Sequence, residues 1–432
     1  MGKFIVRRLG FLVITMILVS IVVFAITESS PGNVARNILG AFVTPEQEAS
    51  FLAQMGMDKP VWKRYLYWLA GSDTQASRKA GMDLVRIRTE KGFVEWWARD
   101  DAGTLRRWKL SGDDLVAIVR QQDGSVSTVN DNGRWRKNSG GSYYFWGVDN
   151  GNRAVKWEKG TDKTVWTFSL GKGWAESSGG AVEYLPLKKG FIRGDPGVSM
   201  LTGRPVADSI FVRLRNSLVL AGIAFTIVMP MALLLGIIAG LREGSLQDRV
   251  LSVGGMVFSV IPEFATGIFL ILIFSVWLKI VPGATVFGEL APWQRLDMLI
   301  LPVLTLTLVE LGYVLRITRA SMVEVMRSAY IRTAYLKGLS YKRVIFKHAV
   351  RNALMAPITV IMLHVNWLMG GIVIVEVVFG YPGLGKYLLD SAMNKDINAL
   401  ETGAMILVIV AVGTQLIADI IYTFLNPRIR YT

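Results

Sequence analysis

Long apolar runs dominate the pattern of this chain. Six of them are long enough to cross the roughly 30 Å of hydrocarbon in a bilayer as helices. They lie at residues 9–27, 217–241, 251–280, 298–317, 357–378 and 403–425. The pattern predicts an all-α membrane protein with six spans. Pro230 and Pro262 interrupt the second and third runs, where a proline either kinks a span or is tolerated.

The first apolar run follows three basic residues, Lys3, Arg7 and Arg8, as the core of a secretory signal peptide would. The run is nevertheless long enough to span a bilayer, and no small-x-small cleavage site closes it cleanly. We therefore expect an uncleaved membrane anchor.

Basic residues are distributed unevenly between the loops. With the N-terminus inside, the short outer loops hold Arg295, Lys386 and Lys395, whereas the cytosolic segments hold many more Lys and Arg residues. Lys and Arg collect on the cytosolic side of membrane spans. The asymmetry predicts that both termini are cytosolic.

Composition supports a membrane protein with a sizeable polar part, because 52% of the residues are hydrophobic and 19% are charged. The formal net charge of +15 could also indicate nucleic-acid binding. The cytosolic basic residues explain this charge better, so we expect contact with membrane lipid and no nucleic-acid partner. The absence of cysteine excludes disulfides, cysteine-ligated zinc and thiol catalysis.

The long segment between the first two runs changes character in its middle, at residues 72–190. Turn dipeptides such as Asp123-Gly124 recur there between short alternating runs such as 163–168, which predicts a meander of antiparallel strands, a small sandwich or barrel. Ahead of it, Thr44 is a predicted helix N-cap with Gln47 three residues on. Eight of the chain's 13 tryptophans lie in the middle part: Trp96, Trp97, Trp108, Trp135, Trp146, Trp157, Trp166 and Trp174.

These tryptophans allow two interpretations. They can form the core of a small domain without disulfides, where aromatic rings supply most of the buried area. They can instead form an exposed aromatic surface that binds sugar rings, peptide side chains or another protein. We expect the core.

A basic polar segment, residues 319–354, lies between the fourth and fifth runs. Its pattern is helical, and Gly338, four residues after Ala334, can end a helix so that the chain turns. The spacing resembles the Glu-Ala-Ala-x-x-x-Gly signature of ABC-importer permeases, with Arg332 and Thr333 in place of its first two residues.

Two further segments resemble the dipeptide/oligopeptide branch of that family. One is the turn at residues 376–385 after the fifth run, and the other is the tail at 426–431, where Asn426 replaces the usual aspartate. The resemblance covers about residues 1–70 and 191–432 and leaves the tryptophan-rich segment outside it.

The resemblance implies a six-helix ABC-importer permease bundle with a β-rich extracytoplasmic domain inserted between spans one and two. The implied organisation is an N-terminal span and outer helix at 1–71, the inserted domain at 72–190, and a five-span core at 191–432. In a bacterial inner membrane, residues 28–216 would be periplasmic.

The resemblance also implies partners. An importer permease works with a second homologous permease subunit, two ATP-binding subunits and a periplasmic substrate-binding protein, for which residues 72–190 are a candidate docking site. A short cytosolic helix, seated in a groove of the ATPase, couples hydrolysis to movement of the pore. The residues implied for this coupling are Arg332, Thr333, Ala334, Lys337, Gly338, Leu339 and Ser340.

The sequence predicts that this chain is not an enzyme. Gly383-Leu-Gly385-Lys386 is too short for a phosphate-binding loop and falls on the outer side. Two histidines, His348 and His364, without a clustered ligand set do not support metal catalysis. We expect no cofactor on this chain, with ATP and magnesium bound by the partner ATPase subunits.

Polar side chains inside the predicted spans are candidates for the transport path. An ionisable group at mid-membrane costs roughly 2.5–3.5 kcal/mol and therefore usually faces a cavity or a partner. Such residues could contact a cation or a peptide amine in the pore, or form hydrogen bonds with the second permease subunit. The pore-lining candidates are Glu263, Glu310, His364 and Asn366, with Asp419 a weaker one.

These observations predict an importer subunit that forms the translocation path for short peptides. Oligosaccharides, opines, glutathione and nickel chelates are alternative cargoes of the same branch. An ion-coupled secondary carrier would use Glu310 and His364 as a proton site, but internal inverted repeats are absent and the coupling segment is present. A membrane-anchored receptor would not need six spans with polar residues inside them.

Overall fold

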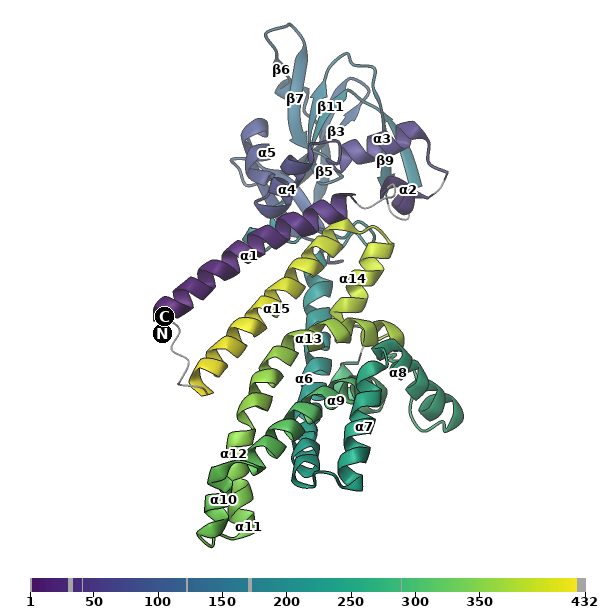
Figure 1. Ribbon diagram of the computed structural model, residues 1–432. Coiled ribbons are helices and arrows are strands. Elements are labelled where there is room, and N and C mark those ends of the chain that lie inside the picture. The colour runs from purple at the N-terminus through teal and green to yellow at the C-terminus, as the bar shows by residue number, and fades with distance from the viewer. Residues whose placement is uncertain are drawn as a thin grey trace. The chain divides into compact units, whose positions relative to one another are not determined.

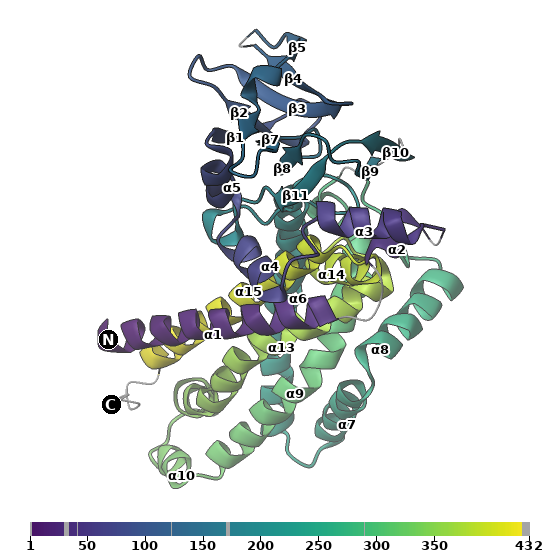
Figure 2. The same cartoon turned by 90° about the horizontal axis from the view of Figure 1, so that it is seen from above.

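The computed structural model describes residues 2–29, 34–40, 42–121, 123–169, 173–288 and 290–425. The chain forms two compact units (Figures 1 and 2). The helical unit consists of Met1–Ile17, Ile210–Leu389 and Met405–Thr432, and the mixed unit consists of Leu18–Ser209 and Asp390–Ala404. Every described strand belongs to the mixed unit.

Long apolar helices build the helical unit. Two short stretches wind more widely, as π-helix, at Ile271–Trp277 after α8 and at Val344–Ala349 between α11 and α12. The helices that lie wholly or mainly in this unit are α6 (Val206–Leu241), α7 (Leu246–Val260), α8 (Glu263–Leu270), α9 (Ile300–Met326), α10 (Ala329–Leu336), α11 (Tyr341–Arg343), α12 (Val350–Ala353), α13 (Met355–Phe379), α14 (Leu384–Met393) and α15 (Ile397–Leu425).

The helices are long and apolar enough for a multi-pass membrane protein. Within the described ranges, five helices could each cross a membrane, and two bent helix pairs raise the number to seven if each pair is one span. The predicted class, a helical membrane protein with a β-rich part, is confirmed at this level.

The third apolar run is not one straight helix. α7 and α8 meet at a bend of 107°. Pro262 has no N–H to donate, and it holds the preceding residue, Ile261, in an extended conformation with ψ of 128°. Pro230, in contrast, lies inside the continuous helix α6. The two prolines thus have opposite effects, which the sequence left open.

Glycines allow α6 and α7 to pack closely on α9. A Cβ atom added at Gly236 would lie 2.5 Å from the Cβ of Thr318, and one added at Gly312 would lie 1.9 Å from the carbonyl oxygen of Gly255. Small residues permit such approaches between helices in lipid. These glycines therefore serve the packing of the helical bundle.

Antiparallel strands form the middle of the mixed unit. The first sheet is a meander of β1 (Asp83–Arg88), β2 (Val94–Arg99), β3 (Leu105–Ser111), β4 (Asp114–Arg120) and β5 (Val126–Asn130). The second sheet has the order β11 (Ala181–Pro186), β8 (Arg153–Glu158), β7 (Tyr143–Val148) and β6 (Arg136–Lys137), and β9 (Thr164–Ser169) pairs with β10 (Gly173–Ser178) as a separate hairpin.

Five helices precede the strands along the chain. They are α1 (Gly2–Ser29), α2 (Val34–Leu39), α3 (Pro45–Gln54), α4 (Val61–Leu69) and α5 (Asp73–Ala80). Thr44 caps α3 as predicted: its hydroxyl accepts from the N–H of Gln47 at 3.3 Å, and the Gln47 side chain accepts from the N–H of Thr44 at 3.1 Å. This capping box fixes where α3 begins.

Tryptophans form much of the core between the sheets. Trp108 is 1% exposed and meets Phe145 edge-on, and Phe145 stacks on Trp157. Trp135, Trp166 and Trp174 are half-buried. The predicted core role is confirmed for five of the eight tryptophans in this segment: Trp96, Trp97, Trp108, Trp146 and Trp157.

Candidate functional site

The predicted coupling residues lie on and just after α10. Ser328 precedes the helix, Lys337 follows it, and Gly338 then adopts the left-handed conformation with φ of +73°. The N–H of Leu339 donates to the carbonyl of Ala334 at 3.3 Å, which closes the end of the helix. An added Cβ at Gly338 would meet no other atom within 4 Å, so the backbone conformation alone requires glycine here.

One face of α10 packs inside the chain. Ile331 and Ala334 are buried in a cluster with Met322 of α9 and with Val344 and Ala349 of the following turns. The small side chain of Ala334 therefore serves the packing of α10 on its own subunit. This orientation could not be read from the sequence, because the segment carries apolar residues on more than one face.

The opposite face of α10 is open to solvent. Arg332, Thr333 and Lys337 are exposed, and Leu336 is 80% exposed. Leu336 was not among the predicted coupling residues, although it lies one turn after Arg332 on the same face. Leu339 is half-buried, and Ser340 is exposed.

Large apolar side chains on α10 and in the turns after it are also exposed. Leu336, Tyr341 and Phe346 are exposed by 80%, 57% and 73%, and Tyr330 is exposed by 42%. A group of exposed apolar residues on a segment that also carries many basic side chains is typical of a protein–protein contact. We call these four residues the apolar rim.

Two ion pairs attach the α6–α7 turn to α9, the helix that leads into α10. Arg319 of α9 donates to Asp248, with Nη2 2.7 Å from Oδ2, and Asp248 is 2% exposed. Arg327 lies 2.6 Å from Glu243 in a more open pair. Neither pair could be predicted from the sequence, because the acidic partners lie more than 70 residues before Arg319 and Arg327.

The polar candidates inside the spans fall on three helices. His364 of α13 lies with Nδ1 2.7 Å from Oε2 of Glu310 on α9, and Glu310 is 3% exposed. Tyr313 places its ring 4.6 Å from the imidazole. A Cβ added at Gly371 of α13 would lie 2.9 Å from Oε1 of Glu263 on α8. The structure therefore joins Glu310 to His364 and sets Glu263 against the same helix, α13.

The acidic groups in this cluster have no strong cationic partner. Across the described ranges, Lys and Arg form no ion pair with Glu263 or Glu310. The hydroxyls of Thr266 and Thr307, one turn away on α8 and α9, are buried and have no hydrogen-bond partner among the residues that the structure describes. Described residues offer no group of three or more side chains able to hold a metal ion. The side chains of Asn366 and Asp419 lie outside the described part of the structure, as do residues 426–432 of the predicted tail.

The turn at residues 376–385 is built around a buried carboxylate. Glu376 is completely buried, and it accepts from the hydroxyl of Ser217 and, at 3.0 Å, from the N–H of Lys386. A Cβ added at Gly383 would lie 2.0 Å from Oε1 of Glu376, so only glycine fits there. The helix bends by 73° across this turn, and the distant Ser217 was not foreseen from the sequence.

The comparisons with known proteins cover both ends of the chain. Residues 232–431 match the binding-protein-dependent transport system inner membrane component, and residues 1–82 match the N-terminal part of such a membrane component. The chain is 35% identical over 254 residues to the oligopeptide transport system permease protein AppB of Bacillus subtilis, which covers 58% of this chain and 80% of that protein. The chain belongs to this family of ABC-importer permeases.

Other relatives of the permease carry related names. It is 37% identical over 245 residues to the glutathione transport system permease protein GsiC of Shigella flexneri, covering 56% of this chain and 76% of the relative. An inward-facing MetNI methionine ABC transporter covers 51% of the chain with a TM-score of 0.40 and 17% identity, too weak a likeness to add to the assignment. Permeases of this family are not enzymes themselves.

Proposed function

We propose that this permease forms the translocation path for short peptides in an ABC importer of the bacterial inner membrane. The names of its relatives support peptide cargo, with glutathione as the favoured alternative because GsiC is equally similar in sequence. The observation that carries the importer role is the open face of α10, which offers a separate protein a fixed, solvent-exposed helix.

The coupling step follows from the two faces of α10. Arg332, Thr333, Leu336 and Lys337 insert into a groove of the ATPase subunit. The other residues of the apolar rim, Tyr330, Tyr341 and Phe346, seal the contact. Ile331 and Ala334 fix α10 to α9, and the ion pair of Arg319 with Asp248 extends that attachment to α7. Movement of the ATPase is thereby transmitted to the helices that carry Glu263 and Glu310.

The proposed importer role implies partner proteins. They are a second homologous permease subunit, two ATP-binding subunits that hold ATP and magnesium, and a periplasmic substrate-binding protein that docks on the outer part of the chain. The exposed apolar residues of the long helices contact membrane lipid or the second permease subunit.

Six spans with both termini cytosolic fit the chain best. One span candidate ends in the first half of α13, and another begins in its second half. Because α13 is continuous from Met355 to Phe379, the two count as a single membrane crossing. Counting α7 with α8 as another single crossing then gives α1, α6, α7–α8, α9, α13 and α15. Residues 28–216 are periplasmic in this arrangement, which agrees with the uneven distribution of basic residues.

The β-rich segment at residues 72–190 is an insertion between spans one and two. Its two ends lie side by side: the N–H of Ser72 donates to the carbonyl of Lys188 at 2.8 Å, and a Cβ added at Gly190 would lie 2.4 Å from the backbone nitrogen of Gly71. The matched family regions, 1–82 and 232–431, leave nearly all of the strands outside. The remaining domains are then 1–71 and 191–432.

Glu263, Glu310 and His364 line the transport path and contact the ammonium group of the peptide. Two carboxylates without a Lys or Arg partner among the described residues support a site for a cation. Asn366 stays a candidate for the same path on its sequence position. A hydrogen bond from these groups to the second permease subunit is the alternative.

Uptake measurements test the importer role. Vesicles that hold the complete complex and the binding protein should accumulate a labelled tripeptide when ATP is supplied inside, and not when a proton gradient is applied without ATP. Uptake driven by the gradient alone would contradict the proposal and favour a secondary carrier that uses Glu310 and His364.

A further inference from the structure

The short helix α4 lies against the C-terminal turns of α1, and both belong to the mixed unit (Figures 1 and 2). The hydroxyls of Ser20 and Tyr65 are 2.8 Å apart. The ring of Phe24 lies 5.3 Å from that of Tyr65 and 6.1 Å from that of Trp68. Two successive turns of α1 therefore hold α4.

These contacts set the depth of α4 along α1. The part of α1 that is apolar enough to cross a membrane is Leu9–Glu28. Arg64 of α4 forms an ion pair at 2.7 Å with Glu28, the last residue of that part, and Phe24 lies four residues earlier. At a rise of 1.5 Å per residue, Phe24 is about 6 Å inside the end of the span. Amphipathic helices that lie in a membrane interface are buried to a similar depth, about 5–10 Å.

The side chains of α4 form three strips along the helix. One strip makes the contacts with α1, and a second carries Tyr67, which packs against the tryptophan core. The third strip is open: Trp62 and Leu66, one turn apart, are exposed by 61% and 46%. Val61, at the first position of the helix, is exposed by 49%.

A basic side chain accompanies the open strip. Nζ of Lys63 lies 5.3 Å over the ring of Trp62. Its basic neighbours Lys59 and Arg64 have carboxylate partners, whereas within the described ranges no ion pair involves Lys63. Tryptophan is enriched where a membrane meets water, and lysine can reach from that level to the headgroups. The pairing of Trp62 with Lys63 is therefore typical of a helix in contact with lipid.

The neighbouring turns of α1 expose apolar side chains at the same level. Val22 is exposed by 55% and Ile26 by 66%. Because these residues belong to a membrane-spanning helix, lipid is the solvent that suits them. The open strip of α4 continues the same apolar surface in depth, so one layer of lipid can cover both helices.

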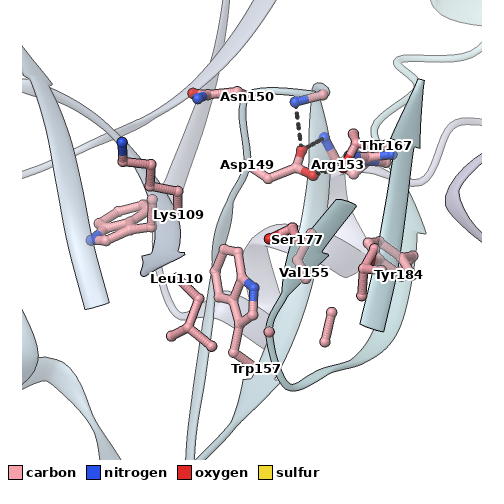
Figure 3. Close-up of a pocket in the computed structure, with 15 residues that line it drawn as sticks. Lys109, Leu110, Asp149, Asn150, Arg153, Val155, Trp157, Thr167, Ser177 and Tyr184 are labelled. Atoms are coloured by element: carbon pink, nitrogen blue, oxygen red, sulfur yellow. Dashed lines mark hydrogen bonds and ion pairs between the residues drawn. The ribbon is translucent and has the colours of Figure 1, made fainter. Parts of the chain in front are cut away.

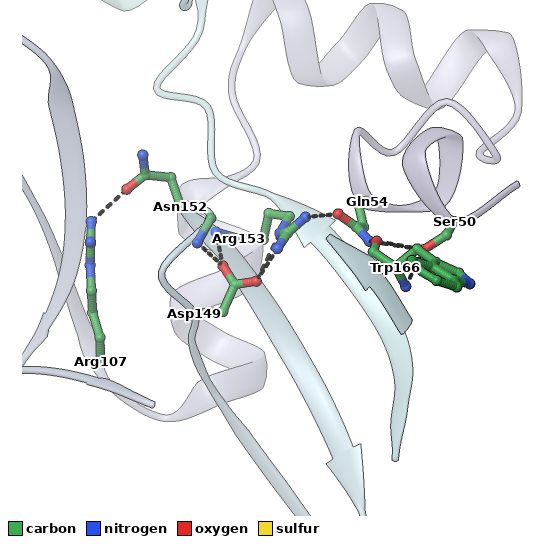
Figure 4. A network of polar contacts seen from close by, with 8 residues as sticks. Ser50, Gln54, Arg107, Asp149, Asn152, Arg153 and Trp166 are labelled. Atoms are coloured by element: carbon green, nitrogen blue, oxygen red, sulfur yellow. Dashed lines mark hydrogen bonds and ion pairs between the residues drawn. The ribbon is translucent and has the colours of Figure 1, made fainter. Parts of the chain in front are cut away.

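Hydrogen bonds join the helices around α4 to the strands (Figure 4). Gln54 of α3 donates to Ser50 at 2.9 Å and accepts from Arg153 of β8, and Ser50 donates to the carbonyl of Trp166 on β9 at 2.9 Å. Arg153 and its ion-pair partner Asp149 also line a cavity of about 220 Å³ between the sheets (Figure 3). A membrane contact made by α4 would thus fix the position of the sheets relative to the lipid.

We infer that α4 is an interfacial anchor that binds the phospholipid leaflet in which α1 ends. Trp62 and Leu66 lie at the boundary between headgroups and acyl chains, and Lys63 reaches the phosphates. The anchor holds the β-rich segment at the membrane surface. This role is separate from the cargo and from the contact with the ATPase.

The test places spin labels on single cysteines, which is possible because the chain has no cysteine of its own. The labelled variants are Trp62→Cys, Leu66→Cys and, as control, Val126→Cys on β5, where the native side chain is exposed by 62%. Each full-length chain is studied in nanodiscs of phosphatidylethanolamine and phosphatidylglycerol. Electron paramagnetic resonance then compares collisions of the label with oxygen, which concentrates among acyl chains, and with a water-soluble nickel complex.

The labels at positions 62 and 66 should collide more often with oxygen than with nickel, and their nickel collisions should be several-fold fewer than at position 126. Unaltered thermal unfolding of the labelled chains shows that the fold is kept. Nickel collisions as frequent as at position 126 would show that α4 faces water. Labels screened from both reagents would show that protein covers the strip, and either result would overturn the inference.

Discussion

At single positions of this permease, either the backbone conformation or a close contact determines which residue type fits. Gly338 is held at positive φ with open space around it, whereas Gly312 has ordinary torsions and no space because the backbone of Gly255 touches it. Sequence shows a glycine in both cases but does not distinguish the two causes. The helix-ending role of Gly338 was predictable from its place after Ala334, and the contact between α7 and α9 was not.

Gly338→Ala should destabilise the chain by about 1–2 kcal/mol, because an L-residue is strained in the left-handed region. Gly254→Ala is the control, since Gly254 lies inside α7 with nothing within 4 Å of an added Cβ, and alanine there should be neutral or stabilising by up to about 1 kcal/mol. Thermal unfolding of the purified chain measures both. Equal midpoints for the two variants would show that the conformation at Gly338 is not the one described.

Elements of this permease are connected by contacts between residues far apart in the sequence. Hydropathy located the apolar helices and turn dipeptides predicted the strands, because both signals are local. The bend at Pro262 could not be predicted, since Pro230 also interrupts an apolar run and yet lies inside a continuous helix. The buried face of α10 and the partner of Arg319 were also hidden, because they depend on tertiary packing.

The ion pair of Arg319 with Asp248 should stabilise the attachment of α7 to α9. Arg319→Met leaves a buried carboxylate without its counter-ion and should cost about 3 kcal/mol, and adding Asp248→Asn should restore part of the loss. The more exposed pair of Arg327 with Glu243 serves as control, where Arg327→Met should cost less than about 1 kcal/mol.

The measurement is thermal unfolding of four chains: the unaltered chain, Arg319→Met, Arg319→Met with Asp248→Asn, and Arg327→Met. If Arg319→Met and Arg327→Met have the same small effect, α7 is not held to α9 through Asp248.

On the scale of the whole molecule, the chain combines a family core with a β-rich segment that the family regions leave out. The helical core and the helix that ends at Gly338 could be predicted, because apolar runs and a short local motif mark them in the sequence. The cavity between the sheets could not, because its lining comes from strands whose pairing the sequence does not specify. The hydrogen bond between Ser72 and Lys188 brings the two ends of residues 72–190 together, so a short linker could join them.

Replacing residues 73–187 with a short Gly-Ser linker should therefore preserve ATP-driven peptide uptake in the assembled complex, because Ser72 and Lys188 are already hydrogen-bonded neighbours. The comparison is with the intact chain at equal membrane content. Loss of uptake by an inserted, assembled variant would show that the segment takes part in transport or in docking the binding protein.

We propose that the open face of α10 transmits the work of the ATPase, and the decisive measurement is ATP-driven uptake by vesicles that carry Leu336→Asp. We expect loss of uptake and at least tenfold less ATPase co-purified with the membrane subunits, because a charge replaces the most exposed apolar side chain of α10. Leu296→Asp, at another exposed leucine, should retain both. Normal uptake and normal ATPase binding by the Leu336→Asp chain would show that α10 does not couple the ATPase to the pore.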